Sequence, residues 1–439
     1  MNFDRKIMRS LAGMLHYRGL LALDQALFSA TNFVLTITLA RVYSDVALAA
    51  YGVGLSSALI AQQFQRNIYI SRFSLLTPRA GLRYMPGCAA EHLMVIGALS
   101  SVFILMAAVA VMFRLGEYLT DIAISTLVCS FIYFQVEFDR MVMIKRGSAM
   151  GAFLLSLAYF IVVLATSGIA FYARIPFAAF MGVLIVFSIV KCGWITLYIT
   201  HPRWGWGMHF LMADMRRYGV SAGMYAVTSA GVVHVPVMVL AASSPPSQVA
   251  ALVAMRSLTQ PLQLVVRSFD IAERNRFRAL SGGTTAGARR GYWRIFSLYA
   301  GVGVLGLMFV AAAPAQIIHL AYGARFHGTS GLLLGWCVYA VLIGVTSAHM
   351  VVIRVLDRDN HFILWLVLGA IAATAFAVLF CSTYGATGAM LGTLFGAAVT
   401  AAGGFHTIRE VAFGRGSKPL PSQLHSRARS GEQSAAIGN

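Results

Sequence analysis

The stretch that decides the fold runs from residue 149 to residue 172 and reads AMGAFLLSLAYFIVVLATSGIAFY. It contains no charged side chain, and it is longer than the roughly 20 residues that an α-helix needs to cross a bilayer. Basic residues stand on both sides of it, Lys145 and Arg146 before it and Arg174 after it. The pattern predicts a membrane-spanning helix.

Comparable apolar stretches recur along the whole chain. Hydrophobic residues make up 59% of the 439 residues and charged residues 11%, whereas about 25% of the residues in an ordinary soluble domain are charged. We therefore predict an all-α polytopic membrane protein with about 12 transmembrane helices in two six-helix lobes around a central cavity. The predicted spans are 21–40, 46–65, 91–113, 118–138, 149–172, 175–199, 217–242, 248–270, 291–313, 329–353, 361–382 and 385–408.

The distribution of Lys and Arg predicts the orientation of the chain. Loops rich in these residues remain on the cytoplasmic side of a membrane, and here they are concentrated in alternate connections and in both terminal segments. The opposite connections hold only Arg41, Arg114, Arg174 and Arg325. We therefore predict a multi-pass membrane protein with both termini in the cytoplasm.

A short internal similarity indicates two related halves. The sequence SDVALA at residues 44–49 resembles SQVAAL at residues 247–252, each at the start of a predicted span, and parallel repeats with a substrate site between them are a recurring transporter design. The end of the chain is polar and rich in Ser, Gly and Pro, which is typical of disorder. The predicted segments are a cytoplasmic N-terminal segment (1–20), an N-terminal lobe (21–199), a cytoplasmic inter-lobe connection (200–216), a C-terminal lobe (217–408) and a disordered tail (409–439).

Composition and motifs also exclude several classes of function. The net charge of +19 falls in the predicted cytoplasmic loops, where anionic lipid headgroups account for it, so we predict no nucleic-acid partner. The five cysteines are scattered without a metal-binding or disulfide spacing. The chain contains no Walker loop, HExxH or GxSxG context. We predict a protein that is not an enzyme and that has no catalytic residue, cofactor or metal site.

The span at 248–270 carries a polar stripe. Arg256, Gln260, Gln263 and Arg267 follow i, i+4, i+7, i+11 spacing, which places them on one face of a helix over a length of roughly 16 Å. Pro261 lies beside the stripe and favours a kink. Because a charge inside a membrane is costly, such residues usually face a cavity that serves a function.

The first span carries a second stripe with the same spacing. It consists of Gln25, Ser29, Asn32 and Thr36, with Asp24 at its cytoplasmic end. One interpretation is that both stripes line a shared aqueous cavity between the lobes. The alternative is that the Ser, Thr and Asn side chains join helices through interhelical hydrogen bonds.

The positions of the acidic residues indicate the charge of the substrate. None lies at the centre of a predicted span, whereas Arg256 and Lys191 lie within spans. A cationic cavity favours an anionic substrate, and the planar guanidinium fork suits phosphate. His234 and His349, also within spans, have side chains that could relay protons or serve as hydrogen-bonded core residues.

Four segments resemble one family of membrane proteins. They are LDQALFSATNFVLTITLARVYS (23–44) followed by YGVG (51–54), FQVEFDRMVMIKRG (134–147), AMRSLTQPLQLV (254–265) and YGATGAMLGTLFG (384–396). Together they are similar to the bacterial polysaccharide flippases, which transport O-antigen or exopolysaccharide units, in the multidrug/oligosaccharidyl-lipid/polysaccharide (MOP) exporter superfamily. The resemblance extends over residues 20–408.

The resemblance implies a function and a location. It implies translocation of undecaprenyl-diphosphate-linked oligosaccharides across the bacterial inner membrane by alternating access, for exopolysaccharide or O-antigen assembly. A polysaccharide polymerase and chain-length proteins are implied as partners, besides the lipid-linked substrate and membrane lipids. The runner-up is a multidrug or cation antiporter of the same superfamily, which needs a membrane-buried carboxylate. A polymerising enzyme and a structural scaffold are less favoured.

The resemblance also implies roles for individual residues. Arg256 would meet the diphosphate, Gln260 and Asn32 would meet sugar hydroxyls, and Arg140 with Arg146 would receive the headgroup. Asp139 departs from the basic residue that is often found beside Arg140 in the family. The predicted substrate-binding residues are Arg256, Gln260, Gln263, Arg267, Asn32, Gln25, Lys191 and Arg140.

Overall fold

The computed structural model is built from helices, with no strand in the residues that it describes. These residues are 2–70, 78–112, 116–268, 285–356 and 359–413, together with Phe73, Glu273 and Phe277. The all-α prediction is confirmed. The predicted disordered tail lies outside the described residues except for its first part, 409–413, which continues the last helix.

The N-terminal half of the chain forms long helices that follow the predicted spans. We use this term for everything before residue 204. Its elements are α1 (Asn2–Val42), α2 (Asp45–Gln65), the π-helical turn η1 (Arg66–Ile70), α4 (Pro78–Met112), α5 (Glu117–Lys145), α6 (Ala149–Ala173), α7 (Phe177–Cys192) and the π-helical η2 (Gly193–Ile199).

The C-terminal half, from residue 204 onward, repeats this pattern with one additional short helix. Its elements are α8 (Trp204–Ser243), α9 (Pro246–Ser268), α11 (Thr285–Ala312), the short α12 (Pro314–Tyr322), the 3₁₀ turn η3 (Gly323–Phe326), α13 (Ser330–Val355), α14 (Asp359–Tyr384) and α15 (Ala386–Phe413).

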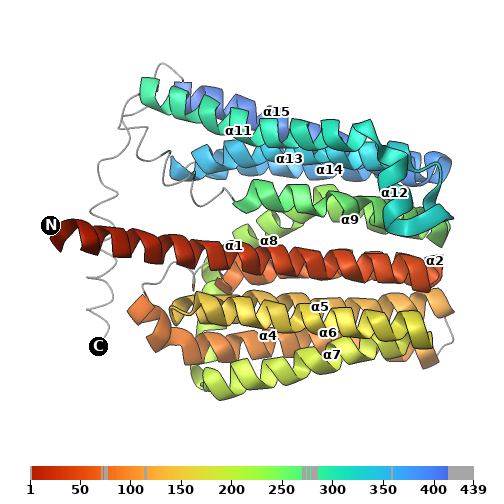
Figure 1. Cartoon of the computed structure of the whole chain (residues 1–439), viewed down its shortest axis with the longest axis horizontal. Helices are drawn as coiled ribbons and strands as arrows, with labels where there is room; N and C mark the ends of the chain where they lie inside the picture. The colour runs from red at the N-terminus through yellow and green to blue at the C-terminus, as the bar shows by residue number, and fades with distance from the viewer. Residues whose placement is uncertain are drawn as a thin grey trace.

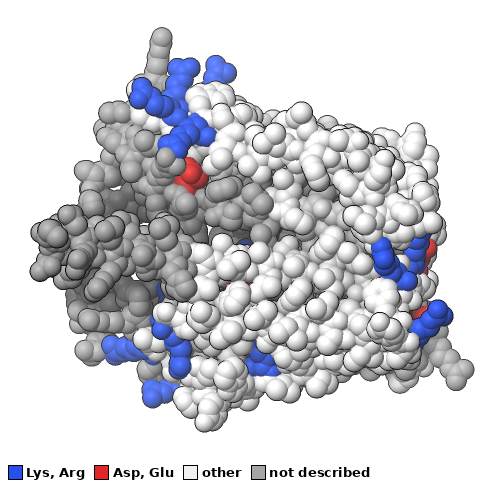
Figure 2. All heavy atoms as spheres, in the orientation of Figure 1, with Lys and Arg blue, Asp and Glu red and all other residues white. Residues whose placement is uncertain are grey.

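Hydropathy marks most of these helices as membrane spans. Within the described residues, ten helices are long and apolar enough to cross a membrane. The predicted spans 217–242 and 248–270 are the two that are not among them. The first falls on α8, in which the described apolar stretch Ala230–Ser243 is shorter, and the second falls on α9, which carries the polar stripe. Figure 2 shows the same polarity on one face, with Lys and Arg mostly towards the two ends of the bundle and a largely uncharged surface between them.

The sequence marks where several of these helices begin. Ser44 precedes α2 and Ser148 precedes α6, and the Oγ atom of each accepts a hydrogen bond from a backbone N–H three residues later, at 3.3 and 3.0 Å. Serine is favoured at this position because it satisfies an N–H that the first turn leaves unpaired. Gly147, with φ of +75°, provides the tight turn before Ser148.

The helices run roughly along one axis (Figure 1). In the N-terminal half α2 packs on α5 and α1 packs on α6, while in the C-terminal half α14 packs on α15 and α11 on α13. The halves meet where α1 and α2 contact α9, and where α2 and α4 contact α8. A single apolar cluster, which includes Leu39, Tyr133 and Trp336, extends across this interface. Residues near the middle of α1, α2 and α9 therefore lie between the two halves.

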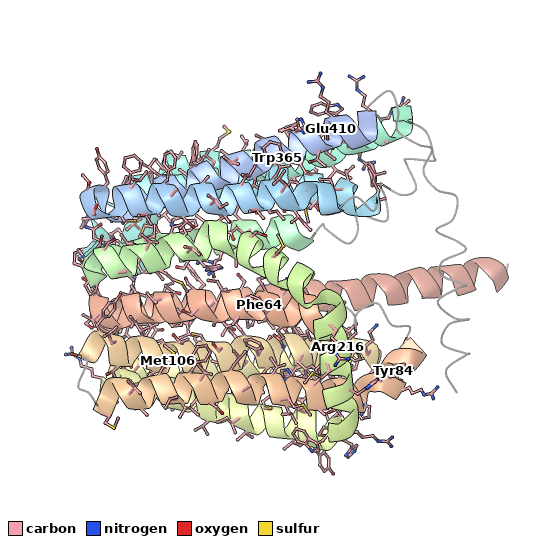
Figure 3. All side chains as sticks on the ribbon, turned by 180° about the vertical axis from the view of Figure 1, so that it is seen from behind. Phe64, Tyr84, Met106, Arg216, Trp365 and Glu410 are labelled. Atoms are coloured by element: carbon pink, nitrogen blue, oxygen red, sulfur yellow. The ribbon has the colours of Figure 1, made fainter. Side chains whose placement is uncertain are left out.

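Helix α8 connects the halves. Near its start, the N–H of Arg203 donates to the carbonyl of Pro86 in α4 at 2.9 Å, and further along, Gly231 lies against Ala370 of α14. Figure 3 shows that the stretch of α8 with Arg216 runs across the bundle and that the rest of the helix runs along it. Most of the predicted connection, 200–216, is therefore helical.

Candidate functional site

Arg256 occupies the middle of α9, at the interface between the halves. Its Nη1 atom lies 3.3 Å from Nδ1 of His234 on α8, and its guanidinium carbon lies 5.7 Å from the ring centroid of Trp336 on α13. Trp336 is fully buried and donates its indole N–H to the carbonyl of Leu252, one turn before Arg256, at 3.1 Å. Trp336 thus contacts both the backbone of α9 and the guanidinium of Arg256, and a cation over an aromatic face is a favourable contact.

The N-terminal half presents polar side chains to the same region. Tyr51 on α2 and Tyr133 on α5 lie near Arg256. The side chain of Asn32 on α1 lies near the Tyr133 hydroxyl, and Phe28 packs edge-on against the Tyr133 ring at 5.4 Å. Asn32 and Arg256, which belong to the two predicted stripes, therefore both lie near Tyr133.

The rest of the α9 stripe continues from Arg256 towards the end of the helix. Gln260 and Gln263 are half-buried. The Nε2 atom of Gln263 is buried and has no hydrogen-bond partner among the described residues. Arg267 is part of α9, but its side chain lies outside the described part of the structure. The structure thus places three of the four stripe residues.

The residues of the α1 stripe form hydrogen bonds in different places. Thr36 donates to the carbonyl of Asn32 at 2.9 Å, so the hydrogen bond of this hydroxyl lies within its own helix. Gln25 faces another helix: the orientation that satisfies its amide places the oxygen 2.5 Å from Nη1 of Arg140 on α5. Only part of the α1 stripe therefore faces the interface between the halves.

A first buried charge cluster lies within the N-terminal half. Asp24 is fully buried and accepts from Nε of Arg140 at 2.6 Å and from Oγ of Ser156 on α6 at 2.5 Å. Glu137 lies 4.0 Å from Nη1 of the same arginine and 3.1 Å from Nε of Arg66. Arg140 is consequently held by a carboxylate that is itself hydrogen-bonded, which is the condition for a stable buried ion pair.

A second cluster lies beside the first. Nζ of Lys191 on α7 is 3.0 Å from Oδ2 of Asp139 on α5, with the two side chains 7% and 2% exposed. The Nε2 of Gln135 donates to Oδ1 of Asp139 at 2.5 Å and to the hydroxyl of Thr196 at 3.0 Å. The charge of Lys191 is therefore neutralised inside the bundle.

Gln135 also determines which ring nitrogen of His92 on α4 carries a proton. Since the Gln135 nitrogen donates to other groups, its oxygen must accept, and the Nε2 of His92 at 2.9 Å must donate. The Nδ1 atom then accepts from Gln65 at 3.4 Å, so this imidazole is neutral. Its ring stacks on Phe138 with a centroid separation of 4.2 Å.

A small pocket joins the two charge clusters. It lies among α1, α5, α6 and α7, and thus inside the N-terminal half. Two predicted substrate-binding residues, Arg140 and Lys191, line it, and each contacts a carboxylate. Its lining residues are Phe28, Val136, Asp139, Arg140, Leu155, Ser156, Tyr159 and Lys191.

The structure corrects one expectation about the acidic residues. No membrane-buried carboxylate was expected, because Asp24 and Asp139 stand near the ends of predicted spans. Both are buried, at 0% and 1% exposure, inside apolar helices that are long enough to cross a membrane. A position near the end of a helix does not determine burial, because neighbouring helices extend past it. The argument against an antiporter, that a membrane-buried carboxylate is missing, therefore no longer holds.

Sequence reasoning also missed His92, Gln135, Ser156 and Thr196, which complete the two clusters. Gln135 and Asp139 are four residues apart, a spacing that puts them on one helix face, and this signal was available. In the described residues, no group of three His, Cys, Asp or Glu side chains is arranged to hold a metal ion.

Comparison with known proteins identifies the fold but not the family. No family model matches the chain, and no curated protein matches it. An inward-facing multidrug resistance MATE family transporter of the MOP superfamily aligns with a TM-score of 0.64 and 15% identity, over 88% of this chain and 94% of that one. The lipid II flippase MurJ in an inward closed conformation aligns with a TM-score of 0.63 and 12% identity, over 89% and 87%.

The chain has the MATE and MurJ transporter fold. An outward-facing MATE transporter of the MOP superfamily aligns less closely, with a TM-score of 0.51 and 14% identity, over 90% of this chain and 94% of that one. These neighbours are transporters and flippases rather than enzymes. The MATE and MurJ fold, together with the ten apolar helices, confirms a multi-pass membrane protein.

Proposed function

We propose that this protein is a flippase that translocates undecaprenyl-diphosphate-linked oligosaccharides across the bacterial inner membrane. The observation that carries the proposal is the position of Arg256 at the interface of the two halves. His234 and Trp336 orient the guanidinium through an imidazole nitrogen and an aromatic face. A guanidinium at this position suits the recognition of a diphosphate, because its planar fork can bind two oxygens at once.

The groups around Arg256 fit the rest of such a substrate. Asn32 and the tyrosines of the N-terminal half offer amide and hydroxyl groups to sugars, and Gln260 and Gln263 extend the polar stripe along α9. Under this proposal Arg140 and Lys191 act differently, because Asp24 and Asp139 already hold them. They stabilise the N-terminal half, and the headgroup is bound at Arg256.

The fold supports transport by alternating access. The substrate site of such transporters lies at the interface of two halves, as Arg256 does here. The MurJ neighbour acts on lipid II, a lipid-linked substrate, and it matches this chain about as well as the inward-facing MATE transporter does. A polysaccharide polymerase and chain-length proteins would receive the product, and both termini would face the cytoplasm.

The test is a transport assay in liposomes. Purified protein is reconstituted, and a labelled undecaprenyl-diphosphate oligosaccharide is monitored for accessibility on the opposite side of the bilayer. Wild type should transfer it and Arg256→Ala should reduce transfer to the protein-free level. The matched control is Arg294→Ala, because Arg294 is an exposed arginine on α11 and its removal should leave transfer unchanged. Equal transfer by wild type and Arg256→Ala would contradict the assigned role.

A second function is favoured by a different observation. Asp24 and Asp139 are buried carboxylates inside the N-terminal half, which is the feature that a proton- or cation-coupled antiporter requires. The MATE neighbours are multidrug transporters. In the same liposomes, efflux of a cationic dye driven by an ion gradient, lost in Asp139→Asn and retained in Arg256→Ala, would favour the antiporter over the flippase.

A further inference from the structure

A contact between the halves closes the end of the bundle opposite the N-terminus. We call this end, which carries the turn between α1 and α2 together with α12 and η3, the α12 end (Figure 1). Arg41, in the last turn of α1, donates through Nε to the carbonyl of Ala321 at 2.7 Å and through Nη2 to that of Leu320 at 2.5 Å. An arginine of the N-terminal half thus caps the last carbonyls of α12 in the C-terminal half.

A second arginine makes the reciprocal contact. Arg325 in η3 donates through Nε and Nη2 to Oδ1 of Asp45, at 2.9 and 2.6 Å. Its Nη1 donates to the carbonyl of Tyr43 at 2.6 Å and also to that of Ala40. Each half therefore contributes an arginine that donates hydrogen bonds to backbone carbonyls of the other half. All of these hydrogen bonds must break before the halves can separate at this end.

The α12 end is connected directly to the helix that carries Arg256. The hydroxyl of Tyr322, the last residue of α12, lies 2.5 Å from Oγ of Ser257 and donates to the carbonyl of Ala254 at 2.9 Å. These two residues flank Arg256. Burial raises the pKa of Tyr322, so the hydroxyl remains protonated and can donate at neutral pH. A second link runs from the hydroxyl of Thr329 to Sδ of Met255 at 3.4 Å.

We propose that Arg41, Asp45 and Arg325 form a latch that holds the external end of the transport path closed, and that Tyr322 couples this latch to the substrate site at Arg256. The term external follows from the predicted orientation of the chain. The coupling rests on the proposed function, whereas the latch itself does not. If α9 moves when the substrate binds at Arg256, the hydrogen bonds of the Tyr322 hydroxyl transmit this movement to the end of α12. The carbonyls of Leu320 and Ala321, which accept from Arg41, then move as well.

The latch is tested without any substrate. Spin labels are placed at cysteines introduced for Tyr172 at the end of α6 and Tyr384 at the end of α14, two residues that are 94% and 58% exposed. The five native cysteines are all buried and so accept little label. The distance between the labels is then measured in nanodiscs by double electron–electron resonance for wild type, Arg325→Ala and Asp45→Asn.

The latch predicts a redistribution of these distances. Wild type should show mainly the short label distance. In both variants the fraction of molecules with a longer distance should be several-fold larger than in wild type. Asp45→Asn changes no backbone and little volume, so it remains informative if Arg325→Ala fails to fold. Unchanged distances in Asp45→Asn and in any folded Arg325→Ala would overturn the latch.

The coupling is tested with Tyr322→Phe, which removes the hydroxyl and keeps the ring. Undecaprenyl diphosphate is the probe, and its binding and its effect on the label distance are measured separately. In wild type the probe should bind and lengthen the distance, and in Tyr322→Phe it should bind without doing so. Lengthening in both proteins would overturn the coupling. Absence of binding to wild type would instead count against the proposed function and would leave the latch result standing.

Discussion

The N-terminal half and the interface between the halves hold basic side chains in different ways. Arg140 and Lys191 lie 2.6 and 3.0 Å from buried carboxylates, whereas Arg256 lies against the imidazole of His234 and the indole of Trp336. A carboxylate neutralises the charge that it contacts, and an imidazole nitrogen or an aromatic face orients a guanidinium. The role of a basic residue inside a membrane protein is therefore indicated by its partner more than by its depth.

The largest effect on stability is expected from removing a buried partner. Asp24→Ala leaves Nε of Arg140 and Oγ of Ser156 without their acceptor, and breaking a buried ion pair by removing one partner costs about 3–5 kcal/mol. The variant should unfold at a clearly lower temperature in detergent. Asp45→Ala is the control, because the Asp45 side chain is 39% exposed in its ion pair and such pairs contribute about 0–1 kcal/mol. Unfolding of Asp24→Ala at the wild-type temperature would show that the first cluster is not structural.

A double-mutant cycle sharpens the same comparison on the second cluster. Lys191→Met alone should destabilise by about 3–5 kcal/mol because Asp139 is left charged and buried. Adding Asp139→Leu should recover most of the loss, since a buried pair can be replaced by apolar groups at little cost. The free energies of unfolding of the four proteins give the coupling. Additive losses would mean that the two side chains act independently.

An intermediate effect is expected at the interface. Asn32→Leu keeps the branched shape of the side chain and removes the amide that lies near Tyr133, and a hydrogen bond of such a group is worth about 1 kcal/mol. Transport of the lipid-linked oligosaccharide should fall several-fold while the unfolding temperature changes little. A loss of stability as large as that of Asp24→Ala, with transport intact in the folded fraction, would assign Asn32 to packing instead.

The smallest effect is expected four residues further along α1. The Thr36 hydroxyl donates only to the carbonyl of Asn32 in its own helix, so Thr36→Val should change stability by less than about 1 kcal/mol and leave transport unchanged. Both quantities are measured beside Asn32→Leu. A transport loss equal to that of Asn32→Leu would mean that the whole α1 stripe faces the substrate.

The fold was accessible from the sequence because its signals are periodic and local. The long apolar runs and the polar stripe of α9 correspond to elements of the structure. Helical spacing placed Arg256, Gln260 and Gln263 on one face of α9, but no spacing rule specifies that Tyr133 of α5 lies near Arg256.

The charge clusters and the latch were not accessible, for physical reasons. Asp24 and Arg140 are far apart in the chain, and only the packing of α1 on α5 and α6 brings the carboxylate, the guanidinium and Ser156 together. Arg41 and Arg325 stood out in the sequence only as exceptions to the bias of basic residues. The charge bias of loops reports on topology and contains no information about the carbonyls that these side chains contact.

The most direct test of the account is the affinity of the protein in nanodiscs for undecaprenyl diphosphate, which carries the headgroup without sugars. Arg256→Gln should weaken binding about tenfold or more, because a hydrogen bond to a charged group contributes about 1.5–3 kcal/mol. Arg294→Gln, at an exposed position on α11, should bind as wild type does. Equal affinity of wild type and Arg256→Gln would contradict the claim that the charge held by His234 and Trp336 is the one that recognises the substrate.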